Sequence, residues 1–305
     1  MRALAYSDFG AAPVITDLPT PEPAAGEVLV QVRASSVNGF DLGALGGFLK
    51  GMYEYDFPVV VGKDFAGVVA AVGDGVTSVA VGDAVFGVVM RPTLGQGGFA
   101  EYVAVNEAYG LAPLPPGLDH TRAGALGLAG TAALNAVDAV APAPGETMLI
   151  SGATGGVGAY AIQLAAARGA TVLATARPGA EAAFVTALGA AHTVNPDDLA
   201  TQVRAVAPGG VHSALHLAGD GEVVAGLLVQ DGRFTSTIHF SPARPGIKAT
   251  AVMADPNSAT LTRLAEDVVA GRLRVPIAGT YPLAGAAPAL TAFTEGTVGK
   301  LAITV

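Results

Sequence analysis

The stretch Thr147-Met-Leu-Ile-Ser-Gly-Ala-Thr-Gly-Gly-Val-Gly158 decides the fold of this chain. Its first five residues are typical of a short buried strand in a parallel sheet. The glycines then turn the backbone, and residues 159–168 are rich in strong helix formers. A strand, a glycine turn and a helix in this order form the context of a dinucleotide-binding fingerprint.

The fingerprint here has the form A-x-G-x-x-G, with Ala153, Gly155 and Gly158 at its fixed positions. Gly155 would let the backbone approach a pyrophosphate, which the free N–H groups of the helix start bind, and Gly158 would let helix and strand pack closely. An ordinary glycine-rich turn is the alternative, since the bare motif is weak, but the surrounding alternation of strands and helices favours a cofactor site. The expected binding turn consists of Gly152, Ala153, Thr154, Gly155, Gly156, Val157 and Gly158.

Composition narrows the possible functions. The chain has 305 residues, enough for two domains with sizeable cores. Its net charge of −9 argues against nucleic acid or an anionic membrane as the main partner. No signal peptide is apparent, and the uncharged run 147–167 has a Gly-rich centre that favours a strand–turn–helix over a membrane span. The absence of cysteine excludes disulfides, thiolate zinc sites and cysteine nucleophiles, so we expect a cytoplasmic protein.

The first third of the chain is typical of a β-rich domain. Short strand patterns separated by Gly and Pro turns occur at residues 1–6, 28–33, 68–72, 80–87 and 98–105. Their regular spacing predicts a partly open β-barrel. The Pro-rich segment 112–117 marks the exit from this domain.

From His120 onward, helices and strands alternate. Residues 123–140 predict a helix with a possible break at Gly130-Thr131. The next predicted strands are 147–151, 170–175, 192–195, 213–218, 232–238 and 248–254. Predicted helices lie between or after them at 180–188, 198–206, 222–230 and 261–270, and residues 300–305 form a final strand. This alternation predicts a doubly wound parallel sheet.

Taken together, these residues resemble the medium-chain dehydrogenase/reductase superfamily, and within it the zinc-independent (zeta-crystallin-like) quinone oxidoreductases. The marks that carry the resemblance are residues 58–67, 76–86, 130–132 and 152–158, with weaker support from Gly299-Lys300. The resemblance implies an α/β protein with a GroES-like, partly open β-barrel catalytic domain built from residues 1–119 and 271–305. A Rossmann NADP-binding domain, residues 120–270, would be inserted between them. We also expect a homodimer.

The departures from the superfamily pattern concern metal binding. The zinc alcohol dehydrogenases of the superfamily carry a Cys and a Gly-His-Glu as ligands, where this chain has residues 38–41 and Gly62-Lys63-Asp64. The four-cysteine structural zinc loop is missing too, so we expect no metal. Without a Lewis acid, the oxidation of simple alcohols loses its usual means of activating the hydroxyl. The short-chain dehydrogenases are rejected, because no tyrosine of this chain has a lysine four residues later.

The choice of cofactor depends on the end of the second Rossmann strand, where NAD enzymes usually place an acidic residue. Here the strand ends Ala174-Thr-Ala-Arg177, with no acid before Glu181. Arg177 offers a bidentate partner for a 2′-phosphate, and Thr175 offers a hydroxyl donor. NADPH is therefore the predicted cofactor, the alternative being that Arg177 is a solvated loop residue.

Further cofactor-binding residues come from the resemblance and from the carboxyl edge of the predicted sheet. Thr131 matches a family threonine near the nicotinamide and phosphates; the alternative is a helix-interior hydroxyl bonded to the preceding turn. The family often has an acidic residue where this chain has His216, whose role stays open. The carboxyl edge, where ligands bind in such sheets, contains Gly219, Ser236, Thr237 and Ile238.

Three residues of the first domain are predicted to face the nicotinamide: Asn38, Asp41 and Tyr53. Asn38 can donate a hydrogen bond to a substrate carbonyl, and Tyr53 can donate to an oxygen on which charge develops. Tyr55 competes with Tyr53 for this role, because the register of residues 51–58 against the family pattern is open. The alternatives are a turn asparagine and half-buried packing tyrosines.

The sequence thus predicts an NADPH-dependent reductase of quinones or α,β-unsaturated carbonyl compounds. The nicotinamide would supply the hydride and the protein would supply positioning and a polar pocket. A non-catalytic NADPH-binding sensor or a structural crystallin-like protein is the alternative, because its fingerprint would look the same.

Overall fold

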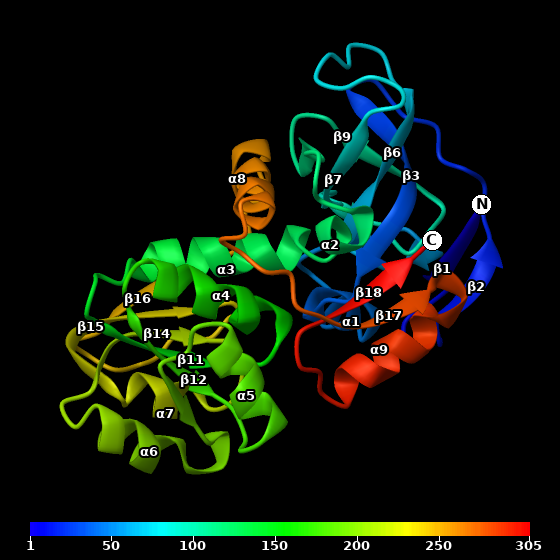
Figure 1. The fold of residues 1–305 in the computed structure, drawn as a ribbon. Helices are drawn as coiled ribbons and strands as arrows, with labels where there is room; N and C mark the ends of the chain where they lie inside the picture. The colour runs from blue at the N-terminus through cyan, green and yellow to red at the C-terminus, as the bar shows by residue number, and fades with distance from the viewer. The chain divides into compact units, whose positions relative to one another are not determined.

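The computed structural model describes residues 1–305 and divides into two compact units (Figure 1). Unit 1 comprises Met1–Leu128 and Pro256–Val305, and unit 2 comprises Ala129–Asp255. The predicted nucleotide-binding domain, residues 120–270, is longer than unit 2 at both ends. It includes two helices that lie in unit 1, namely α2 (His120–Gly124) and α8 (Ser258–Val269).

Unit 2 contains a six-stranded sheet in the order β13-β12-β11-β14-β15-β16, and every neighbouring pair is parallel. The order runs outward from β11 in both directions, which is the doubly wound arrangement predicted from the alternation of strands and helices. The carboxyl ends of β11 and β14 meet at the point where the order reverses. The strands are β11 (Thr147–Ser151), β12 (Thr171–Thr175), β13 (His192–Val194), β14 (Val211–His216), β15 (Leu228–Ser236) and β16 (Lys248–Ala251).

The helices of this part of the chain differ from the predictions at two places. The helix predicted over 222–230 stops after five residues, because Leu228 already pairs with Val211 as the start of β15. A helix break was predicted at Gly130-Thr131, but the break in the structure lies at Ala125-Leu126, between α2 and α3. Burial of Thr131 inside α3 outweighs the weak helix propensity of Gly-Thr. The helices are α3 (Gly127–Val140), α4 (Gly156–Ala167), α5 (Ala180–Ala187), α6 (Leu199–Val206) and α7 (Gly221–Ala225).

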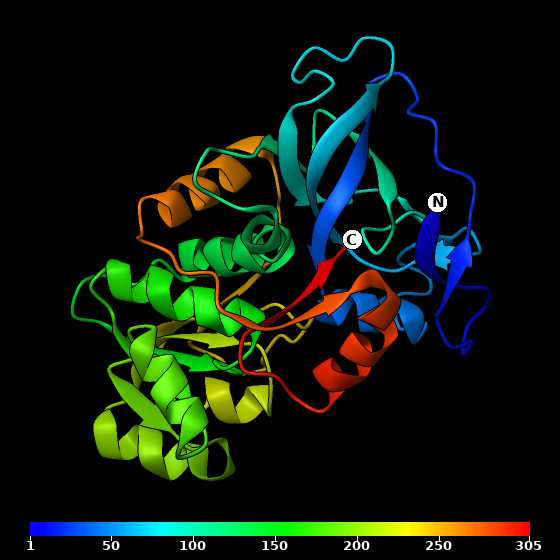
Figure 2. The same cartoon turned by 45° about the vertical axis from the view of Figure 1, so that its right-hand side comes forward.

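Unit 1 is a curved, mostly antiparallel sheet system around β3 (Glu27–Ser36). In the largest sheet the order is β10-β7-β6-β3-β18-β17, and β9 also pairs with β3. The last strand of the chain lies antiparallel to β3, with Ala302 opposite Ser36, so the C-terminus returns to the first domain as the resemblance implied (Figure 2). The strands are β6 (Asp64–Val72), β7 (Ala84–Val88), β9 (Tyr102–Asn106), β10 (Leu111–Pro113), β17 (Ile277–Pro282) and β18 (Lys300–Thr304).

The rest of unit 1 contains small sheets and two helices, α1 and α9. The sequence patterns predict neither helix. A three-stranded sheet has the order β2-β1-β5, and β4 pairs with β8. No helix of the structure combines the length and the apolar composition that a membrane crossing needs. The other strands and α-helices are β1 (Arg2–Tyr6), β2 (Val14–Asp17), β4 (Glu54–Tyr55), β5 (Val59–Val60), β8 (Thr93–Leu94), α1 (Gly39–Leu45) and α9 (Ala286–Thr294). Two 3-10 helices, η1 (Pro196–Asp198) and η2 (Leu283–Gly285), complete the chain.

Candidate functional site

The glycine turn of unit 2 is shaped by two positions that exclude a side chain. Gly152 has φ +73°, and a Cβ there would lie 3.0 Å from the Cβ atoms of Leu217 and Ala218. A Cβ on Gly158 would lie 2.6 Å from the Cα of Ala153. Gly152 therefore lets the turn pack against the segment that follows β14, and Gly158 lets α4 pack against the turn.

Gly155 differs from these two, because a Cβ added there would meet only the Gly152 carbonyl oxygen, at 3.6 Å. It is the N-cap of α4, a helix of 12 residues, and it is partly exposed together with Gly156 and Val157. The first N–H groups of a helix have no partner inside it, and they carry the positive end of the helix dipole. The start of α4 is thus open to an anionic group, and these residues fit the pyrophosphate of a dinucleotide.

Thr175, at the end of β12, stabilises this turn through hydrogen bonds of its side chain. Its side-chain oxygen accepts hydrogen bonds from the backbone N–H groups of Gly152 at 2.9 Å and Ala153 at 3.3 Å. The residue is buried. Thr175 therefore acts on the geometry of the turn, which is a different role from the predicted direct contact with a 2′-phosphate.

Arg177 lies just beyond the same strand and is engaged by the next acidic residue. Its guanidinium forms an ion pair with Glu181 at 3.3 Å, and its backbone N–H donates to the other Glu181 carboxylate oxygen at 2.8 Å. The Arg177 side chain is 63% exposed, so most of its donors face solvent. The sequence indicates the arginine but not its ion pair with Glu181.

Thr131 is completely buried in α3, and its hydroxyl oxygen has no hydrogen-bond partner. The expected alternative, a bond to the preceding helical turn, is therefore absent. A buried hydroxyl without a partner costs about 1–3 kcal/mol, and such an orphaned group is compatible with one that meets a cofactor.

His216, at the end of β14, connects the residues that follow β14 with the end of β15 through hydrogen bonds. Its Nε2 lies 3.1 Å from the Gly219 carbonyl oxygen, and its Nδ1 lies 3.2 Å from Ser236 Oγ. A carbonyl only accepts, so Nε2 carries the proton and the Ser236 hydroxyl donates to Nδ1. Ser236 Oγ in turn accepts from the backbone N–H of Ile238, and the Thr237 N–H donates to the His216 carbonyl. His216 is thus a positioning residue for the predicted cofactor-binding residues of this edge.

In unit 1, Asn38 lies at the start of α1 and is held on every side. Its amide nitrogen donates to the Ser36 carbonyl at 3.2 Å and to Asp64 Oδ2 at 2.8 Å. Its amide oxygen accepts from Lys300 Nζ at 2.6 Å. Both ends of the predicted substrate-binding amide are already satisfied, which makes Asn38 the centre of a buried polar network.

This buried network also contains two ionic groups that sequence analysis did not assign to the site. Asp64 is fully buried and accepts from Ser36 Oγ at 2.6 Å and from the Leu128 N–H at 2.7 Å. Lys300 Nζ lies 3.7 Å from Asp64 and donates to the Val37 carbonyl at 2.9 Å. Burial lowers the pKa of Lys300, while Asp64 and Asp41 oppose the shift.

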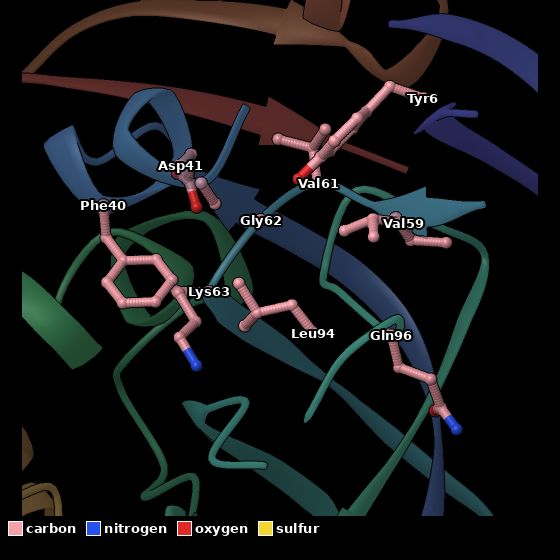
Figure 3. Close-up of a pocket in the computed structure, with 11 residues that line it drawn as sticks. Tyr6, Phe40, Asp41, Val59, Val61, Gly62, Lys63, Leu94 and Gln96 are labelled. Carbon is pink, nitrogen blue, oxygen red and sulfur yellow. The ribbon is translucent and has the colours of Figure 1, made fainter. Parts of the chain in front are cut away.

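Asp41 is buried beside this network and lines a small cavity with Tyr6 and Lys63 (Figure 3). One of its oxygens accepts the Asn38 backbone N–H at 2.8 Å, which stabilises the first turn of α1. Burial nevertheless raises the pKa of Asp41 to about 7. The space open to the centre of a water molecule is about 20 Å³, enough for one water. The Tyr6 hydroxyl is buried without a partner, and burial raises its pKa.

The two competing tyrosines have different surroundings. The Tyr55 hydroxyl donates to the Ala44 carbonyl at 3.3 Å, and its ring stacks on Phe57 at 5.9 Å. Tyr53 packs edge-to-face with Phe40 at 5.6 Å, and its hydroxyl makes no hydrogen bond. Tyr53 therefore has the available donor, while the Tyr55 hydroxyl is used within the fold.

Family models match both units. Residues 24–116 match the alcohol dehydrogenase GroES-like domain, and residues 156–230 match the zinc-binding dehydrogenase family. A solved quinone oxidoreductase from Coxiella burnetii superimposes with a TM-score of 0.90 at 28% identity, covering 100% of this chain and 99% of that chain. The chain belongs to the medium-chain dehydrogenase/reductase superfamily. Within this superfamily it is quinone oxidoreductase-like.

Two curated relatives are similar to this chain in sequence. The quinone oxidoreductase of Rattus norvegicus is 37% identical over 182 residues, which cover 58% of this chain and 53% of the rat protein. The chain thus spans about half the length of that relative. The phthioceranic/hydroxyphthioceranic acid synthase of Mycobacterium tuberculosis is 34% identical over 293 residues, 88% of this chain and 13% of that protein.

The superfamily consists of oxidoreductases that bind a nicotinamide cofactor, and the open start of α4 fits that group. The matched zinc-binding family raises the question of metal ligands. No group of three or more His, Asp or Glu side chains that could hold a metal ion is present in residues 1–305.

Proposed function

We propose that this protein is an NADPH-dependent reductase that transfers hydride to quinones or α,β-unsaturated carbonyl compounds. The observation that carries the proposal is the open, partly exposed start of α4 at the glycine turn, in a chain related to quinone oxidoreductases. When bound, the nicotinamide supplies the hydride.

On the cofactor side, the N–H groups of residues 156–158 would bind the pyrophosphate, with Thr175 and His216 fixing the surrounding backbone. Arg177 would exchange its ion pair with Glu181 for one with the 2′-phosphate of NADPH. NADH has no 2′-phosphate, so this exchange would favour NADPH. The orphaned hydroxyl of Thr131 would gain its missing partner from the cofactor.

On the substrate side, Tyr53 has a free hydroxyl that can donate to an oxygen gaining charge. A conjugated carbonyl accepts hydride without a Lewis acid, because the negative charge spreads over its π system. Zinc independence belongs to this proposal, and it is supported by the absence of a convergent ligand group in residues 1–305.

A homodimer and a cytoplasmic location complete the proposal. The strand β16 is an edge of the parallel sheet, and all of its residues are exposed, as is Met253 with 71% of its surface. A second copy could pair with its free backbone groups. The chain contains no cysteine, which suits a reducing compartment.

Steady-state oxidation of NADPH and NADH with 1,4-naphthoquinone and with 3-penten-2-one tests the proposal. We expect turnover of at least one acceptor and a preference for NADPH. Tight NADPH binding with no turnover of either acceptor would support the non-catalytic alternative, and failure to bind any nicotinamide would refute both functions.

A further inference from the structure

Lys63 is a buried cation with little compensation. The residue is only 6% exposed, and its ammonium donates one hydrogen bond, to the Val89 carbonyl at 2.5 Å. It forms no ion pair. An ammonium has three N–H donors, so two remain unused. Burying a charge in this way is unfavourable unless another group compensates it.

Two aromatic rings cover this ammonium. Lys63 Nζ lies 4.6 Å from the centre of the Phe40 ring and 5.8 Å from that of Tyr53. Figure 3 shows the Lys63 side chain running past the Phe40 ring, with its nitrogen at the end farther from Asp41. Phe40 and Tyr53 are themselves partly exposed. The cation therefore lies next to an accessible aromatic rim.

We propose that Lys63, together with Phe40 and Tyr53, forms a site for a planar conjugated carbonyl compound and stabilises its oxygen as that oxygen becomes anionic. The rings would pack against the π system, while a spare N–H of Lys63 donates to the oxygen. This site rests on the proposed reductase function, for which it specifies the residue that stabilises the negative charge on the substrate oxygen.

The proton balance of the reduction follows from this site. Hydride brings both electrons to the substrate and leaves an enolate or a hydroquinone anion. The oxygen then takes a proton from Lys63, so an N–H bond breaks, an O–H bond forms, and the neutral amine regains its proton from water. Burial lowers the pKa of Lys63 to about 8, against the opposing charges of Asp41 and Asp64, so the ammonium is a better acid than an exposed lysine.

Binding of p-nitrophenolate tests the site without turnover, since this planar anion mimics the product oxygen. We expect Lys63→Met to weaken its binding at least tenfold, while binding of the neutral 4-nitroanisole changes less than twofold. Lys50→Met is the matched control, because the exposed Lys50 also lies over an aromatic ring, that of Phe9 at 3.5 Å. Should Lys63→Met misfold by circular dichroism, Lys63→Gln provides a polar replacement without the charge.

Turnover separates proton donation from a structural role. The oxygen of an enolate is more basic than that of a hydroquinone anion, so Lys63→Met should lower kcat for the enone more than kcat for the quinone. Equal losses for both acceptors, or unchanged p-nitrophenolate binding, would overturn the site. A wild-type protein inactive with both acceptors would instead refute the proposed function, and p-nitrophenolate binding would still judge the site.

Discussion

The glycine turn of unit 2 and the polar network of unit 1 present opposite chemistry. The turn is open and offers backbone N–H groups, with no ionised side chain among residues 152–158. The network is closed and consists of buried side chains, among them Asp64, Lys300 and Asn38. A side chain added to the glycine turn should weaken ligand binding there. A charged side chain removed from the buried network should lower the free energy of unfolding. The two regions should therefore respond differently to substitution.

The largest effect is expected when the network loses one charge. Lys300→Met leaves Asp64 buried without its cation, and the free energy of unfolding should fall by about 3–5 kcal/mol in urea denaturation. Arg2→Met is the exposed control: it breaks the ion pair with Glu101, where the Arg2 side chain is 64% exposed, and should cost less than about 1 kcal/mol. The double variant Asp64→Asn/Lys300→Met should recover part of the loss. Equal small losses in both single variants would show that the network is not an energetic unit.

The next effect concerns the pH dependence of the network. The pKa of Asp41 is raised from 3.8 to about 7, so its contribution to stability is fully present below pH 3.8 and is lost as the pH rises through 7. Asp41→Asn keeps an oxygen for the Asn38 N–H and removes the titration. Between pH 5 and pH 7.5 the wild type should therefore lose roughly 2–3 kcal/mol relative to this variant, measured by urea denaturation at both pH values. A constant difference between the two proteins would contradict the assignment.

The sequence indicates most residues of the polar network but not how they come together. Asn38 and Asp41 stand out by their chemistry, and Gly299-Lys300 only as a family mark. Lys300 and Asn38 are 262 positions apart, and they meet only because β18 pairs with β3. Side-chain hydrogen bonds across such a distance depend on tertiary pairing, which no local pattern contains.

In unit 2, a charged contact beside the turn should decide between cofactors. A charge-assisted bond to the 2′-phosphate contributes about 1.5–3 kcal/mol, so Arg177→Ala should weaken NADPH binding about tenfold to a hundredfold. NADH binding should barely change, since NADH has no 2′-phosphate. Fluorescence titration measures both cofactors. Equal weakening of both would mean that Arg177 supports the fold and does not recognise the phosphate.

A side chain added to the turn tests the backbone site itself. Gly155→Val places two methyl groups in the open space before α4, so NADPH binding should weaken at least tenfold, about 1.4 kcal/mol. The melting temperature should change little, in contrast to Gly158→Val, whose Cβ would meet backbone at 2.6 Å. Normal NADPH binding by a folded Gly155→Val protein would place the cofactor elsewhere.

The turn was predictable because it is local. Strand, glycines and helix are consecutive, and the steric reason for glycine at 158 is contact with Ala153, within one βα unit. The end of α7 was mispredicted for the opposite reason. The apolar segment Leu227-Leu228-Val229 suits a helix or a strand equally, and only pairing with β14 selects the strand. Arg177 was likewise visible in the sequence, while its partner depended on how α5 begins.

The smallest expected effect comes from that partner, Glu181. In the structure its carboxylate holds both the guanidinium and the backbone N–H of Arg177, so a bound 2′-phosphate must displace it from the guanidinium. An exposed ion pair of this kind is worth roughly 0.3–1 kcal/mol, and losing it should free the arginine. Glu181→Gln should therefore strengthen NADPH binding about twofold to fivefold, since the glutamine oxygen can still accept the backbone N–H. NADH binding should stay the same, and 0.5 M salt should reduce the gain, because salt screens the pair in the parent protein. Weaker NADPH binding in Glu181→Gln would mean that the glutamate orients Arg177 toward the phosphate and does not compete with it.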